Sequence, residues 1–225
     1  MTSGRLPRRR GRAALVAVVA AALPVALLVG GCGRSVDGEP HARPTEDALR
    51  GPEDLEALIV TEVPSGLPRL ADDELDPPAG PKRVEDVAEY ADDPAREREV
   101  LQEFGYRYGW ERFWGAGAGP VTGVFVDLFE TRAGAGAYVE DLARNEAEQY
   151  SGMLWEDPPG LPGNCRLLTV DEAAPDSDLS GPAAFAWCGH GDFSVSVTSI
   201  ADSIGAAEQE VRLVLEEQLG LLPRR

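Results

Sequence analysis

Two segments in which successive side chains belong to alternate strand faces, each followed by a helical pattern, constrain the fold of this chain more than any other feature. Alternation with a period of two predicts a β-strand, because successive side chains of a strand point to opposite faces. The segments are residues 121–129 and 192–200. In the first, Val124, Val126 and Leu128 belong to one face and Phe125, Asp127 and Phe129 to the other, so we expect both faces to be at least partly covered. In the second, Ser194 and Ser196 alternate with phenylalanine and valine, so we expect the serine side to face water.

Each of these strands leads into a predicted helix. Thr131 and Ser203 are typical N-cap residues, and the apolar residues after each of them recur at the spacing of one helical face. The order of hairpin and helix therefore occurs twice, about 70 residues apart, which suggests an internal duplication. We predict an α+β fold in which an antiparallel sheet has its helices packed on one face.

A further helix and an aromatic strand are predicted between residues 94 and 114. Pro94 is favourable at a first helical position, and Gly105 readily takes the left-handed conformation that ends a helix. After it, Tyr106, Tyr108 and Trp110 alternate with charged or small residues. This pattern predicts a strand with one aromatic face.

Cys165 and Cys188 are predicted to form a disulfide. Residues 165–171 and 182–188 are two short apolar segments that can pair as an antiparallel hairpin. If residue 171 lies opposite residue 182, Cys165 lies opposite Cys188, at a Cα separation of about 4.5–5.5 Å that a disulfide can bridge. Such a bond is expected in an oxidising compartment.

The segment Cys188-Gly-His190-Gly-Asp192 allows a different interpretation. A thiol, an imidazole and a carboxylate within five residues could ligate a transition metal or provide a nucleophile with its base. The two glycines, however, favour the tight turn of a hairpin, and a disulfide at Cys188 would remove the thiolate. We therefore assign no metal site and no catalytic residue, and we expect no cofactor.

Candidate ligand-binding residues lie in the aromatic segment and on the neighbouring strand. Aromatic rings can stack on a ligand while adjacent charges orient it. Asp127 lies between Phe125 and Phe129 on one strand face, so desolvation should raise the pKa of its carboxyl. The alternative is that the aromatic residues belong to the core and rim of the sheet, with Asp127 at the sheet edge or paired with an arginine. The candidates are Trp110, Glu111, Arg112, Trp114 and Asp127.

The first 32 residues have the three parts of an export signal. Five arginines between residues 5 and 12 precede an apolar run of 17 residues, from 13 to 29, which ends in Val29-Gly30-Gly31-Cys32. A segment with this order of basic, apolar and small residues is removed from the mature protein. An uncleaved membrane anchor is the alternative, but the run is interrupted by Pro24 and is shorter than the about 20 residues that a spanning helix needs.

Residues 29–32 resemble the lipobox of bacterial lipoproteins. In that family the cysteine is lipidated and becomes the first residue of the mature protein, so the resemblance implies lipidation of Cys32 and anchoring at the extracytoplasmic face of the cell membrane. We expect a signal peptide at residues 1–31, lipidated Cys32 with a flexible tether at residues 32–50, and a single α+β extracytoplasmic domain at residues 51–225. The composition also resembles that of envelope lipoproteins of high-GC actinobacteria.

The part of the chain after the leader is strongly acidic. All 39 Asp and Glu residues follow Cys32, whereas five of the 21 Lys and Arg residues precede it, which leaves a formal charge of about −23. This charge repels nucleic acid and favours neutral or cationic partners. We therefore expect no nucleic-acid partner. The expected partners are the membrane, through the lipid anchor, and a small ligand or an envelope protein.

These observations favour a non-enzymatic, membrane-tethered domain that binds a ligand or a partner protein. The chain has no Gly-x-Ser-x-Gly elbow, no phosphate-binding glycine loop and no His-Glu-x-x-His helix. An envelope hydrolase that uses acidic residues near Asp127 is one alternative, and an accessory subunit of an envelope complex is another. A pocket containing both Asp127 and His190 would favour the enzyme, whereas an exposed apolar patch at Trp110 and Trp114 would favour binding.

Overall fold

The computed structural model describes residues 49–117, 119–172, 177 and 179–223. These residues lie in one compact unit, whose bounds are His41–Arg225. The expected signal peptide, Cys32 and nearly all of the expected tether lie outside the described residues. Among the residues described, no helix is both long enough and apolar enough to cross a bilayer.

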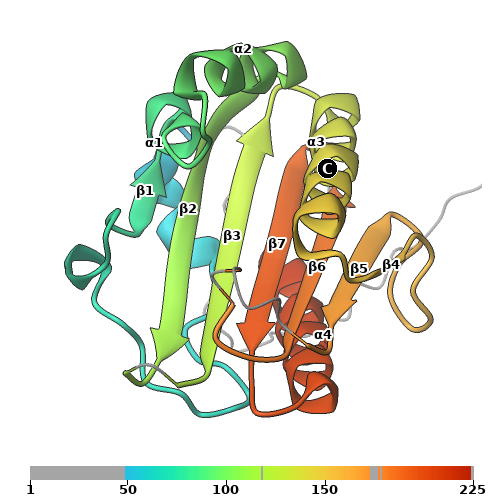
Figure 1. The fold of residues 1–225 in the computed structure, drawn as a ribbon. Helices are drawn as coiled ribbons and strands as arrows, with labels where there is room; N and C mark the ends of the chain where they lie inside the picture. The colour runs from blue at the N-terminus through green and yellow to red at the C-terminus, as the bar shows by residue number, and fades with distance from the viewer. Residues whose placement is uncertain (1–48, 118, 173–176, 178, 224–225) are drawn as a thin grey trace, which may run out of the picture. The chain divides into compact units, whose positions relative to one another are not determined.

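A seven-stranded antiparallel sheet forms the centre of this unit (Figure 1). The spatial order is β1-β2-β3-β7-β6-β5-β4, so the two strands predicted from alternation, β3 and β7, pair with each other in the middle of the sheet. The strands are β1 (Gly80–Lys82), β2 (Tyr106–Gly115), β3 (Val121–Phe129), β4 (Met153–Trp155), β5 (Cys165–Val170), β6 (Ala183–His190) and β7 (Phe193–Ile200).

Helices connect and cover these strands, which confirms the predicted α+β fold with an antiparallel sheet. The predicted caps are in place, because Thr131 accepts a hydrogen bond from the Gly134 amide and Ser203 accepts one from the Ala206 amide. Gly105 ends its helix in the left-handed conformation, at φ 77°. The helices are η2 (Pro52–Leu58), η3 (Asp72–Glu74), α1 (Val84–Ala88), α2 (Pro94–Phe104), α3 (Arg132–Tyr150) and α4 (Ile204–Leu221).

The helices cover both faces of the sheet, not one face as the sequence suggested. Val124, Val126 and Leu128 of β3 share a buried cluster with η2 and α4, and we call this side of the sheet the α4 face. Phe125, Asp127 and Phe129 point to the opposite side, the α3 face, where Phe129 packs with α1, α2 and α3. Figure 1 shows α3 in front of the strands and α4 behind them. Apolar side chains occur on both sides of the central strands, so both sides need cover.

The recurring order of hairpin and helix does not produce two equivalent units. The hairpins β2-β3 and β6-β7 meet at the β3-β7 pair. A repeated unit would place its helix on the same side of its own hairpin, but α3 and α4 contact opposite faces. The tertiary arrangement therefore does not support an internal duplication.

A β-bulge at the start of β2 separates tyrosines that the sequence places on one face. Tyr106 pairs with Phe129 and Tyr108 pairs with Leu128, so the register shifts between them. An extra residue in one strand moves the neighbouring side chains to the other face. Tyr106 consequently packs on the α3 face, whereas Tyr108 belongs to the core on the α4 face.

The β5-β6 hairpin has the predicted register, and the predicted disulfide is confirmed. Cys165 lies opposite Cys188, their Cα atoms are 4.1 Å apart, and their sulfur atoms are bonded. Both cysteines are fully buried. After β6, Gly191 takes a φ of 60° in the turn to β7, which is the hairpin turn that the glycines around His190 indicated.

The serine side of β7 does not face water. Ser194 is fully buried and Ser196 is 6% exposed. The reason is that α3 lies over β6 and β7 on the same side of the sheet as these serines. The predicted solvent-exposed face of β7 is therefore wrong, and its serine hydroxyl groups are buried.

Candidate functional site

Strand alternation divides the five predicted ligand-binding residues between the two faces of the sheet. Trp110 and Trp114 belong to the buried cluster on the α4 face. Glu111, between them on β2, and Asp127 on β3 line a pocket on the α3 face. The structure therefore does not bring the five residues together, and only the two carboxyl groups share a site.

The two tryptophans share a buried cluster with the segment after η2, and Arg112 forms hydrogen bonds to that segment. Trp110 is 6% exposed and Trp114 is 1% exposed, so they form no exposed apolar patch. The Arg112 guanidinium donates to the carbonyl oxygens of Ile59, at 3.4 Å, and Val60, at 2.9 Å. These contacts agree with the alternative interpretation of the aromatic segment as core.

The pocket that contains Glu111 and Asp127 has a volume of about 330 Å³. Its floor is formed by β2, β3, β6 and β7, and its sides by the α1–α2 region and by α3. Its lining residues come from α1 on one side and from α3 on the other, and Figure 1 shows where these two helices lie relative to the sheet. Pockets of a few hundred Å³ accommodate small ligands.

Asp127 is the buried acid at the floor of this pocket. The Tyr106 hydroxyl donates to Asp127 Oδ1 at 3.1 Å. Burial and the nearby Glu111 carboxylate raise the pKa of Asp127 to about 7, although the Tyr106 hydrogen bond acts in the opposite direction. The predicted rise of this pKa through desolvation is confirmed. Asp127 can therefore exchange a proton near neutral pH.

Gly109 makes room for this carboxyl. It lies opposite Asp127 in the β2-β3 ladder. A Cβ atom at this position would overlap Asp127 Oδ1 and would lie 2.7 Å from the Tyr106 hydroxyl. Glycine here is required by the close approach of two side chains.

Glu111 forms a closed triad with Lys82 and Tyr90. Lys82 Nζ lies 3.1 Å from Glu111 Oε2, and the Tyr90 hydroxyl donates to the same oxygen at 2.8 Å. Lys82 Nζ also donates to the Tyr90 oxygen at 2.7 Å. Burial raises the pKa of Glu111, while the Lys82 charge lowers it. The two charges of this pair compensate each other at the edge of the pocket.

Two buried hydroxyl groups of β7 have no hydrogen-bond partner among the described residues. Ser194 lies opposite Asp127 in the β3-β7 ladder, and Ser196 lies opposite Phe125. Ser196 also lines the pocket. A buried polar group without a partner costs about 1–3 kcal/mol. A bound ligand or a water molecule that pairs with Ser196 would remove this cost.

Stacked aromatic rings form an apolar wall of the pocket. The ring centroids of Tyr150 and Phe185 are 5.2 Å apart, and those of Phe185 and Trp187 are 5.9 Å apart. The planes of the two pairs are nearly parallel, at 14° and 4°. This wall offers flat, apolar surface to a ligand beside the polar floor.

His190 lies in a different cavity from Asp127. It lines a space of about 670 Å³ together with Glu140 and Asn164. Cys188 is bonded to Cys165, so its sulfur is available neither as a metal ligand nor as a nucleophile. In the part of the chain that the structure describes, no three His, Cys, Asp or Glu side chains are grouped so as to hold a metal ion.

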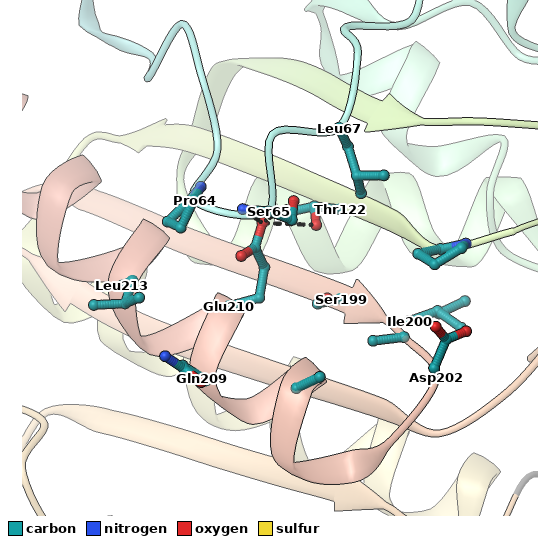
Figure 2. A pocket seen from close by; sticks show the side chains of 13 residues that line it. Pro64, Ser65, Leu67, Thr122, Ser199, Ile200, Asp202, Gln209, Glu210 and Leu213 are labelled. Atoms are coloured by element: carbon teal, nitrogen blue, oxygen red, sulfur yellow. Dashed lines mark hydrogen bonds between the residues drawn. The ribbon is translucent and has the colours of Figure 1, made fainter.

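A third cavity, of about 400 Å³, lies on the α4 face between α4 and the loop that contains Ser65. Figure 2 shows Glu210 of α4 pointing between Ser65 and Thr122. The Ser65 hydroxyl donates to Glu210 Oε1 at 2.6 Å, and the Thr122 hydroxyl lies 3.4 Å from the same atom. The buried Glu210 carboxylate is thus already paired with Ser65 and Thr122, so we assign this contact a structural role.

The sequence pattern does not indicate several residues that line the α3-face pocket or contact its acids. The alternation places Tyr106 on the face of Tyr108 and Trp110, because a bulge cannot be seen in it, and it places Ser196 toward solvent. No sequence pattern indicates the contacts of Lys82 and Tyr90 with Glu111, because these residues are 29 and 21 positions away from it in the chain.

No protein-family model matches the chain, and no curated protein matches it. Among solved structures, the extracellular domain of PknH from Mycobacterium tuberculosis is similar over 54% of this chain and 69% of that chain. The sequence identity is 14% and the TM-score is 0.36. A likeness at this level establishes neither a shared fold nor a shared function.

Proposed function

We propose that this protein is a lipid-anchored extracytoplasmic domain of the cell envelope that binds a small ligand in the pocket on the α3 face. The observation that carries the proposal is the composition of the pocket. It combines the buried Asp127 carboxyl with an aromatic wall and with the Ser196 hydroxyl, which has no hydrogen-bond partner in the described part of the chain. A largely apolar hollow with a few converging polar groups is the usual form of a small-ligand site.

The leader and the disulfide support the proposed location. The lipobox-like residues before Cys32 imply export and lipidation. The Cys165–Cys188 disulfide is the kind of bond that forms and persists outside the cytoplasm. The two features are independent, since one lies in the leader and the other in the folded domain.

A thermal-shift screen of residues 33–225 against sugars, small amphiphiles and metal ions tests the binding proposal. A ligand that binds the folded state raises the melting temperature by linkage. The matched variants are Thr198→Phe, which fills the pocket from its floor, and Thr198→Val, which does not. We expect a ligand to stabilise the wild type and Thr198→Val but not Thr198→Phe. No stabilisation by any compound would favour the accessory-subunit alternative, in which a protein partner covers this face.

Hydrolysis is a second candidate function, because the raised pKa of Asp127 would suit a general acid or base near neutral pH. The separation of His190 from this pocket removes one expected participant. Turnover of any ligand from the screen, abolished by Asp127→Asn with binding retained, would identify an enzyme. Binding without turnover would leave the ligand-binding function alone.

A further inference from the structure

Acids line the pocket on the α3 face. Glu97, Glu111, Asp127 and Glu146 contribute to its surface, and among the described residues neither a lysine nor an arginine lines it. Lys82 lies behind Glu111 and compensates that carboxylate. When ionised, the carboxyl groups of Asp127 and Glu97 give the pocket a negative potential, which is strengthened by the low dielectric of its buried floor.

The floor of the pocket contains hydrogen-bond acceptors that no described residue satisfies in full. Asp127 is 8% exposed and receives one hydrogen bond, from Tyr106. The hydroxyl of Ser196, two residues along β7 from the partner of Asp127, has no hydrogen-bond partner among the described residues. A group that donates several hydrogen bonds would satisfy both.

Aromatic rings surround these acceptors. Phe125 lies two residues before Asp127 on the same face of β3, and Tyr90, Tyr138 and Tyr150 line the sides of the pocket. The face of an aromatic ring attracts a cation, with a gain of about 0.5–2 kcal/mol. The Tyr90 ring already has a cation near it, because Lys82 Nζ lies 5.2 Å from its centroid.

We propose that the ligand of this pocket is an organic monocation, an ammonium group carried on a compact apolar or aromatic body. The ammonium group donates hydrogen bonds to Asp127 and Ser196, and the body packs against the Tyr150-Phe185-Trp187 wall. This inference rests on the proposed ligand-binding function and specifies the chemical class of the ligand.

Other classes of ligand fit less well. An anion would meet the carboxyl groups of the pocket, and no described lysine or arginine lines the pocket to pair with it. Calcium needs six to eight oxygen ligands, and no suitable group of three acidic side chains occurs in the described region. The volume of about 330 Å³ favours a small molecule over a peptide.

The test compares three probes with the same aromatic body and different head groups: 2-phenylethylammonium, 2-phenylethanol and 3-phenylpropanoate. Isothermal titration calorimetry is performed on the full chain in detergent micelles. We expect the ammonium probe to bind at least about ten-fold more tightly than the alcohol, and the carboxylate not to bind. This preference corresponds to an advantage of about 1.4 kcal/mol for the charged head group.

Two variants test whether the acids of the pocket cause the preference for the ammonium probe, and a third variant is a control. Asp127→Asn should reduce the preference for the ammonium probe to less than two-fold while the alcohol binds as before. Glu97→Gln, at the half-buried side of the pocket, should reduce it less. Glu217→Gln, on the exposed side of α4 at the other face of the sheet, should leave it unchanged. Near-ultraviolet circular dichroism verifies that each variant is folded. If Asp127→Asn does not fold, the test is the comparison of probe binding between the wild type and Glu97→Gln.

Equal or tighter binding of the alcohol, lost in Thr198→Phe, would overturn the cation inference and leave the proposed function intact. Absence of binding by all three probes would also overturn it, and the broader screen would then decide whether the pocket binds any ligand. Preference for the ammonium probe that persists in Asp127→Asn and Glu97→Gln would show that the acids are not its cause, and the inference would fail.

Discussion

At the scale of single residues, the Asp127 carboxyl is the group whose chemistry the fold alters most. Its pKa rises from an ordinary 3.8 to about 7. Between these values the folded state holds a proton that the unfolded state has released. The contribution of Asp127 to stability is therefore fully present below about pH 4 and is lost as the pH rises through 7.

The first prediction is a pH dependence of stability that arises from the proton held by Asp127 in the folded state. Relative to Asp127→Asn, the free energy of unfolding of the wild type should fall by on the order of 4 kcal/mol between pH 4 and pH 8. Asparagine retains an acceptor for the Tyr106 hydroxyl but has no carboxyl proton. Urea unfolding of both proteins at intervals of pH measures the difference. A difference that does not change with pH would contradict the raised pKa.

The second prediction concerns the space that Gly109 leaves for Asp127. Gly109→Ala should destabilise the fold by about 2 kcal/mol, because the added methyl overlaps the carboxyl and crowds the Tyr106 hydroxyl. Gly136→Ala is the matched control, since nothing lies within 4 Å of the added atom on α3. That substitution should stabilise the fold by about 1 kcal/mol, as expected for alanine in a helix. Equal effects of the two substitutions, measured by denaturant unfolding, would refute the close approach.

At the scale of elements, α4 is joined to the segment after η2 by one buried amide. Gln218 Nε2 donates to the Leu58 carbonyl at 2.7 Å, and the Val60 amide donates to Gln218 Oε1 at 3.1 Å. Gln218 is fully buried. The Gln218 side chain thus supplies hydrogen bonds to two backbone groups that do not belong to a β-strand.

The third prediction is that Gln218→Leu costs about 3 kcal/mol of stability. Leucine is similar in size but leaves the Leu58 carbonyl and the Val60 amide unpaired inside the protein. Gln209→Leu, the same substitution at an exposed position of α4, should change stability by no more than about 0.5 kcal/mol. Chemical unfolding of the two variants tests this. If Gln218→Leu were as stable as Gln209→Leu, the amide would not hold these elements together.

Several features of the helices and strands are predictable because they depend on residues that are close together in the sequence. The caps at Thr131 and Ser203 and the end of α2 at Gly105 depend on residues within one helical turn. The β5-β6 register depends on the alignment of two adjacent segments. By contrast, the bulge at Tyr106 responds to packing against Phe129 and α3, which a single strand does not encode.

At the scale of the whole molecule, the proposed anchor and the folded domain can be tested separately. Cys32 lies outside the described residues, so its lipidation stays a prediction from the leader. The domain carries its own evidence for an oxidising location in the Cys165–Cys188 disulfide.

The fourth prediction is that metabolic labelling with an alkyne-bearing palmitate marks the wild type and not Cys32→Ser. The reason is that Cys32 is the proposed acceptor of the lipid. Cys165→Ser is the control, because its side chain lies buried in the sheet and should not affect labelling. Intact-mass analysis should find a mature protein that begins at Cys32. An unprocessed amino terminus, or label retained by Cys32→Ser, would exclude the lipoprotein assignment.

Features that depend on neighbouring residues follow from the sequence alone: the longer strands β2, β3, β5, β6 and β7, the helix caps, the hairpin register that joins Cys165 to Cys188, and the desolvation of Asp127. The short strands β1 and β4 and the bulge in β2 do not. Packing between distant segments sets two further features: α3 and α4 cover opposite faces, and Glu111, Asp127 and Ser196 line the same pocket. A helix that follows a strand can return over either face when both faces are apolar. The choice is made by contacts between residues distant in sequence, and the pocket is a consequence of that choice.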